Sequence, residues 1–111
     1  MYASGPRAPG GEVAGMNVES LDRYLLTGSP TKADVVAGLL AMPSPPDQAR
    51  PFLEGLRVLG PRTPDLALIA LRLALSAKPH GDHDVTRLRG LVEKARGGDA
   101  EARDAYAAEF A

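Results

Sequence analysis

Apolar residues recur three and four positions apart along most of the chain, a spacing that is typical of amphipathic helices. The widest apolar stripe runs over residues 66–77, where leucines, alanines and Ile69 occupy two faces of one helix. Such a wide apolar surface predicts a central helix with neighbours on more than one side. No segment shows the strict alternation of a half-buried strand. The pattern therefore predicts an all-α fold of five to six short helices, arranged as a compact bundle or as a short stack of helical hairpins.

Three hydroxyl–proline pairs stand directly before apolar stripes in the middle of the chain. A hydroxyl at the N-cap accepts a hydrogen bond from a free backbone N–H, and proline is well tolerated at the first helical position. We therefore predict that the hydroxyl residue of each pair caps a helix. The three pairs are Ser29-Pro30, Ser44-Pro45 and Thr63-Pro64. Pro51 lies inside the second of these helices, where it predicts either a short first turn and a restart or a kink.

The first helix is predicted to begin at Asn17 and to end at Gly28, since asparagine favours N-caps and glycine favours C-terminal stops. Residues 1–16 are rich in Gly, Pro, Ala and Ser. Such a segment buries too little apolar surface to offset the entropy of ordering it. We therefore predict a disordered N-terminal tail over residues 1–16 and a single helical domain over residues 17–111.

The last two helices are separated by Gly97-Gly98. Asp82 or Asp84 is the predicted cap of a helix over residues 83–96, and Asp99 is the predicted cap of the final helix. Tyr106 and Phe110 share one face of that final helix. We expect this pair to pack on the body of the domain; the alternative is that it anchors a partner on a detachable helix.

The composition limits where the protein is expected to act and which kinds of site it can contain. The formal net charge is −1, so no overall field attracts the chain to nucleic acid or to an anionic membrane. The chain has no cysteine, which excludes disulfides, thiolate metal sites and a cysteine nucleophile. Its apolar stretches are too short to cross a bilayer, and its first residues lack the apolar core of a signal peptide. These features predict a cytoplasmic protein with no membrane partner.

The densest group of potential metal ligands is the loop that contains His80, Asp82 and His83. Ligands one to three residues apart in one loop seldom converge on a metal ion without further ligands from elsewhere. We interpret the loop as a polar connection whose aspartate caps the next helix, and we expect no bound metal and no cofactor. No serine lies in a Gly-x-Ser-x-Gly turn, and no glycine-rich loop has the residues that cradle phosphate. We therefore predict that the protein is not an enzyme; a metal-dependent hydrolase that uses these three residues is the most remote alternative.

Basic residues are more frequent than acidic ones between residues 50 and 96, which contain nine Lys and Arg against five Asp and Glu. The helices predicted over residues 66–77 and 83–96 are joined by a glycine-containing turn, as in a helix-turn-helix. A DNA-binding protein that reads a groove with Arg87, Arg89 and Lys94 of helix 83–96 is therefore the alternative function. Against it, Asp84 lies where base-reading residues belong, and arginines on a helix surface are commonly only solvated.

Adjacent apolar faces favour a third interpretation. Leucine and valine pairs in the first two helices, together with the two-faced helix 66–77, present more apolar surface than a domain of this size covers easily. We therefore predict a non-catalytic helical interaction or adaptor module that binds another protein or associates with itself as a homodimer. The candidate interaction residues are Arg87, Arg89, Lys94, Tyr106 and Phe110.

Overall fold

The computed structural model describes residues 10–76 and 81–111, with side chains from residue 17 onward. The described residues form six α-helices and two short 3-10 helices, and none of them lies in a strand, so the all-α prediction is confirmed. In chain order the elements are α1 (Gly10–Thr27), α2 (Lys32–Leu40), η1 (Asp47–Ala49), α3 (Arg50–Leu59), η2 (Gly60–Arg62), α4 (Asp65–Leu75), α5 (Asp82–Arg96) and α6 (Ala100–Glu109).

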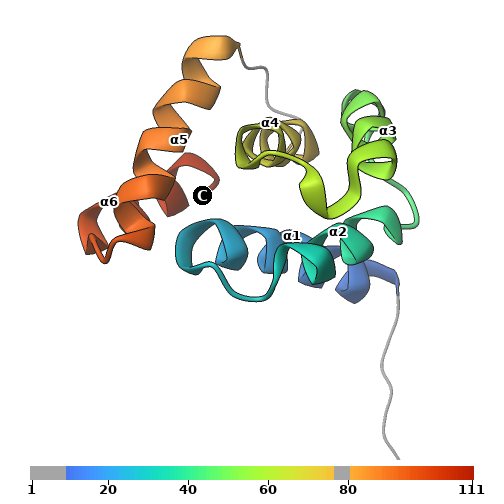
Figure 1. The fold of residues 1–111 in the computed structure, drawn as a ribbon, viewed down its shortest axis with the longest axis horizontal. Helices are drawn as coiled ribbons and strands as arrows, with labels where there is room; N and C mark the ends of the chain where they lie inside the picture. The colour runs from blue at the N-terminus through green and yellow to red at the C-terminus, as the bar shows by residue number, and fades with distance from the viewer. Residues whose placement is uncertain (1–9, 77–80) are drawn as a thin grey trace, which may run out of the picture.

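The helix α4 lies at the centre of a compact bundle. Figure 1 shows α4 between α3 and α5, above a layer that α1 and α2 form. The helix α4 contacts α1, α3 and α5, and α6 packs against α5. Of the two predicted architectures, the structure therefore has the compact bundle around the most apolar helix.

The core draws on every helix. Five residues of α4 are buried, on both of its predicted apolar faces: Leu68, Ile69, Leu71, Leu73 and Ala74. They join a single buried cluster with Leu21 and Leu25 of α1 and Leu39 of α2. Burying one leucine fully contributes about 1.5–3 kcal/mol relative to leaving it exposed. The apolar stripes in the sequence thus account for the position of α4.

The start of α1 differs from the prediction at Asn17, which is wrong: the helix begins at Gly10. Asn17 continues the helix instead of capping it. Its Oδ1 lies where α1 and α2 approach closely, and a Cβ placed on Gly38 of α2 would come within 2.8 Å of that atom. Residues 10–16 of the predicted tail therefore belong to α1 by their backbone, while residues 1–9 lie outside the described residues.

The predicted caps at Ser29, Ser44 and Thr63 are also wrong. The N-cap of α2 is Thr31, whose Oγ1 accepts a hydrogen bond from the backbone N–H of Asp34 at 3.3 Å. Each hydroxyl–proline pair still comes just before a new helical segment. The pairs therefore predict where helices begin, but not which residue caps them.

Prolines occupy the cap positions at the two later starts. Pro46 is the N-cap residue of η1 and Pro64 that of α4, both with extended backbone and without a side-chain cap. The hydroxyls of Ser44 and Thr63 come before these prolines, one position or more too early to reach the free N–H groups of the first turn. The Thr63 hydroxyl is instead buried with no hydrogen-bond partner.

Other boundary predictions hold. Pro51 follows the short 3-10 turn η1 at the start of α3, which is the predicted first turn and restart. Asp99 caps α6, accepting hydrogen bonds from the N–H groups of Glu101 and Ala102.

The predicted cap of the helix after the histidine loop, Asp82 or Asp84, is wrong: α5 begins one residue earlier, so that both aspartates lie in its first turn and Gly81 is the N-cap. The Asp84 carboxylate accepts a hydrogen bond from the Gly81 N–H at 3.4 Å. Within the described part of the chain, no helix has the length and apolar content needed to cross a membrane.

Candidate interaction groove along α5

Two adjoining hollows follow α5 on its α4 side. The first, of about 810 Å³, is lined on α5 by Arg89, Val92, Glu93 and Arg96. The second, of about 490 Å³, is lined on α5 by Asp82, Val85 and Thr86. Both share Pro64 and Leu66 from the start of α4, so together they form one groove, here called the α5 groove.

The floor of the α5 groove is apolar. Ile69 and Val92 are buried beneath it, while the Leu66 side chain stays 42% exposed. Ala67 and Ala70 line the Asp82 end. Because the two alanines are small, the hollow at this end has room for a large side chain from outside.

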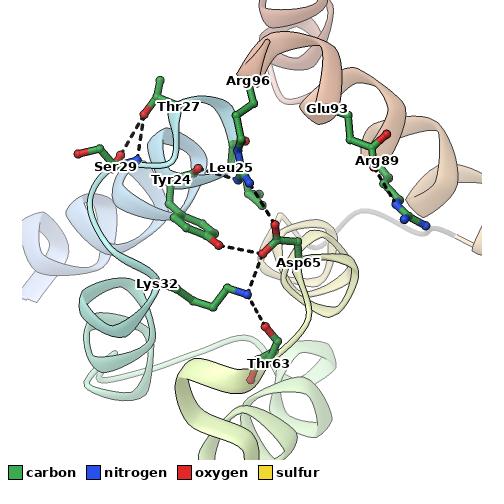
Figure 2. A network of polar contacts seen from close by, with 10 residues as sticks. All are labelled: Tyr24, Leu25, Thr27, Ser29, Lys32, Thr63, Asp65, Arg89, Glu93 and Arg96. Atoms are coloured by element: carbon green, nitrogen blue, oxygen red, sulfur yellow. Dashed lines mark hydrogen bonds and ion pairs between the residues drawn. The ribbon is translucent and has the colours of Figure 1, made fainter.

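One wall of the groove is a polar cluster centred on Asp65. Figure 2 shows the Asp65 carboxylate between Lys32 and Arg96. Its Oδ1 lies 3.0 Å from Lys32 Nζ and accepts a hydrogen bond from the Tyr24 hydroxyl at 2.9 Å. Its Oδ2 accepts from Arg96 Nη1 at 3.3 Å. The cluster therefore ties α1, α2, α4 and α5 together at one end of the groove.

These contacts keep Asp65 and Lys32 charged. Partial burial works against ionisation of Asp65, but hydrogen bonds from Lys32 and Tyr24 and the charges of Lys32 and Arg96 outweigh it and lower the pKa of Asp65. Burial likewise opposes the charge on Lys32, and the hydrogen bond and charge of Asp65 prevail and raise the pKa of Lys32. With two cations around one anion, this end of the groove carries a net positive charge.

Arg96 also completes the end of α1. Its Nη2 donates to the Tyr24 carbonyl at 2.9 Å and its Nε to the Leu25 carbonyl at 3.2 Å. Carbonyl groups in the last turn of a helix lack partners within the helix, and a cation there also complements the helix dipole. Arg96 is thus a structural residue whose guanidinium remains partly exposed at the groove.

A second polar cluster joins α6 to α1 and α4. Asp22 Oδ1 accepts hydrogen bonds from Arg72 Nε, at 2.8 Å, and from the Tyr106 hydroxyl. The Arg72 guanidinium lies over the Phe110 ring, with Cζ 3.8 Å from its centroid. Burial and the nearby Asp22 charge raise the pKa of Tyr106, so its hydroxyl stays protonated as the donor.

The predicted interaction residues fall in different environments. Tyr106 is only 2% exposed and Phe110 is partly buried, so this pair packs on the body of the domain, as the sequence predicted. Arg87 pairs with Glu109 of α6 at 2.8 Å and with Asp84 at 3.3 Å, and these partners raise the pKa of Arg87. Arg89 pairs with Glu93 at 3.3 Å and lines the α5 groove, whereas Lys94 is exposed and does not line it.

The histidine–aspartate loop is only partly described. His80 lies outside the described residues, His83 is exposed, and Asp82 lines one end of the α5 groove. Within residues 17–76 and 81–111, no three His, Asp or Glu side chains are placed to hold a metal ion.

Sequence reasoning missed the two polar clusters. Two of the charged residues in these clusters, Lys32 and Asp65, stand near predicted helix starts, and a third, Arg72, stands in an apolar stripe. Arg96 belongs to the basic excess of residues 50–96, which gives no sign of its structural role. One signal was available: Arg72 interrupts the most apolar helix, and a charge at such a position calls for a partner.

Comparison of the chain with models of protein families, with curated proteins and with solved structures finds no significant match. The function is therefore argued from the geometry of the groove.

Proposed function

We propose that the protein is a non-catalytic helical interaction module whose α5 groove receives a helix of a protein partner. The observation that carries the proposal is the groove itself: a long hollow between two helices with an apolar floor and polar rims. An amphipathic helix places its apolar face into such a groove through side chains three and four residues apart. Leu66, exposed at the middle of the groove, is the apolar side chain that such a helix would cover.

The geometry supports a protein partner better than DNA. The Arg87 and Arg89 guanidinium groups are each held by a carboxylate of the chain, so neither is free to neutralise phosphate without losing an ion pair. Asp84 also lies beside Arg87 at the start of α5, where a recognition helix presents its base-reading residues. We therefore place DNA binding second.

Site-specific photocrosslinking in cells that produce the full chain tests the proposal. A photoreactive amino acid at Ala70, in the groove, is compared with one at Arg103, exposed on α6 and outside the groove. We expect Ala70 to crosslink to one defined protein, and Leu66→Glu to abolish that product. Equal products from both positions, or none from Ala70, would contradict the proposal. Folding of Leu66→Glu is checked by its circular dichroism and melting temperature.

A further inference from the structure

The two ends of the α5 groove carry opposite charge. Asp82 lines one end, at the first turn of α5, whereas the charge of Asp84 in the same turn is paired with Arg87. Arg96 and Lys32 line the other end, where α5 finishes, and Asp65 offsets one of their two positive charges. Between them, Arg89 and Glu93 neutralise each other at 3.3 Å. The groove is thus acidic at the start of α5 and basic at its end.

This polarity makes the groove complementary to itself. A two-fold axis that crosses the middle of α5 places the acidic end of one copy against the basic end of the other, and it does so twice. The same axis sets two α5 helices antiparallel, so that their dipoles are also opposed.

We infer that the helix received by the α5 groove is α5 of a second copy, packed antiparallel in a symmetric homodimer. This inference rests on the proposed function and names its partner. With the axis at Arg89, the middle of the segment Asp82–Arg96, Asp82 faces the second copy's Arg96 and Thr86 faces the second copy's Val92. Each copy covers the exposed Leu66 of the other, and the arrangement closes as a dimer because both grooves are then filled.

The rise of a helix gives the arrangement a measurable signature. Residues at the axis meet their own copies, whereas residues seven positions away are displaced by about 10.5 Å along each helix. The two Asp82 residues are then about 21 Å apart, beyond the reach of a disulfide, which needs Cα atoms closer than about 7 Å. A parallel dimer would bring the two Asp82 residues together instead.

Single cysteines test this signature without interference because the chain has no cysteine of its own. We compare Arg89→Cys, Asp82→Cys and, as a control outside the groove, Arg103→Cys under mild oxidation of the purified full chain. All three native side chains are exposed, and circular dichroism checks that each variant folds. We expect the Arg89→Cys variant to form disulfide-linked dimers at about ten times the rate of the other two or faster, since association raises the local thiol concentration.

Two outcomes would overturn the inference. If the Asp82→Cys variant forms linked dimers as fast as the Arg89→Cys variant, the antiparallel arrangement is wrong. If the Arg89→Cys variant links no faster than the Arg103→Cys control, the groove does not bind a second copy. In the second case a crosslink from Ala70 to a different protein would still support the proposed function, whereas its absence would reject both.

Discussion

The two flanks of α4 are held in different ways. Toward α1 and α5, partly buried charges are hydrogen-bonded across helices: Arg72 to Asp22, and Lys32 and Arg96 to Asp65. Toward α3, Leu56, Leu68 and Leu71 surround a hollow of about 170 Å³. Thr63, which lines the same hollow, has a buried hydroxyl without a partner.

This difference bears on function. Hydrogen bonds to charged groups constrain both the distance and the direction between their partners, whereas the hydrophobic effect is non-directional. The α5 flank is therefore fixed in orientation by its polar clusters, and the α3 flank is held by leucine packing that tolerates small shifts. A preformed groove costs less to occupy than one that must first be ordered, so the α5 flank is the better suited to binding.

The largest effect is expected at Asp22. The substitution Asp22→Ala removes the acceptor shared by Arg72 and Tyr106 and leaves a mostly buried guanidinium without a partner. Because breaking a buried ion pair is costly, we expect the free energy of unfolding to fall by about 3 kcal/mol, measured by urea denaturation. The matched control is Asp47→Ala, just before α3. Asp47 forms an ion pair with Arg50, but its side chain is 94% exposed. That variant should change the value by less than about 0.5 kcal/mol; equal losses would contradict the contrast between the flanks.

A smaller, pH-dependent effect is expected at Asp65. At neutral pH, Asp65→Asn should lower the free energy of unfolding by about 1–2 kcal/mol, a value reduced because the carboxylate is partly exposed. The pKa of Asp65 is lower in the folded protein than in the unfolded chain. Its stabilising contribution is therefore present above the unfolded pKa and is lost as the pH falls through the folded value. Denaturation curves of both proteins should converge in acid below about pH 4; a difference that stays constant with pH would rule out this role.

The α3 flank should gain stability when its unpaired hydroxyl is removed. Thr63→Val replaces the hydroxyl of a residue that is 3% exposed with a methyl group of the same shape. Since a buried polar group without a partner is unfavourable, we expect the free energy of unfolding to rise by about 1 kcal/mol. The control is Thr27→Val, where the hydroxyl donates to the Arg23 carbonyl at 2.7 Å and its loss should give no gain. A loss of stability in Thr63→Val would mean that the hydroxyl has a partner.

The smallest effect is expected at the glycines within helices. A Cβ on Gly55 of α3 meets nothing within 4 Å. Gly55→Ala should therefore raise the free energy of unfolding by about 0.5–1 kcal/mol, because alanine lowers the conformational entropy of the unfolded chain. On α2, Gly38→Ala would bring a Cβ within 2.8 Å of Asn17 Oδ1 and should lack this gain. Thermal melting of the two variants provides the comparison, and equal gains would show that α1 and α2 are not closely packed at Gly38.

The fold was predictable to the extent that it depends on local pattern. The apolar spacing of residues 66–77 predicted the central helix, and Asp99 was recognised as a cap because its partners are two and three residues away. The caps at Ser29, Ser44 and Thr63 failed because a shift of one or two residues places a hydroxyl out of reach of the first turn. Local signals thus predict helices better than their exact ends.

The candidate site depends on contacts that no local pattern contains. Asp22 meets Tyr106, which is 84 residues away, and Tyr24 meets Asp65 across 41 residues. Such pairs become neighbours only when the helices pack. Of the predicted surface residues, Arg89 lines the groove, but it does so because α5 is oriented by Arg96 and Asp65, which sequence reasoning had not singled out.

The most direct test of the α5 groove as a self-association surface is the dissociation constant of the dimer in two variants at one exposed position. Asp82 is exposed and faces the second copy's Arg96 in the antiparallel arrangement, so Asp82→Lys places like charges together twice, whereas Asp82→Glu keeps opposite charges together. Sedimentation equilibrium should show Asp82→Lys raising the dissociation constant by about tenfold or more and Asp82→Glu changing it by less than about twofold. If Asp82→Lys raises the constant no more than Asp82→Glu does, the α5 groove is not the surface through which two copies associate.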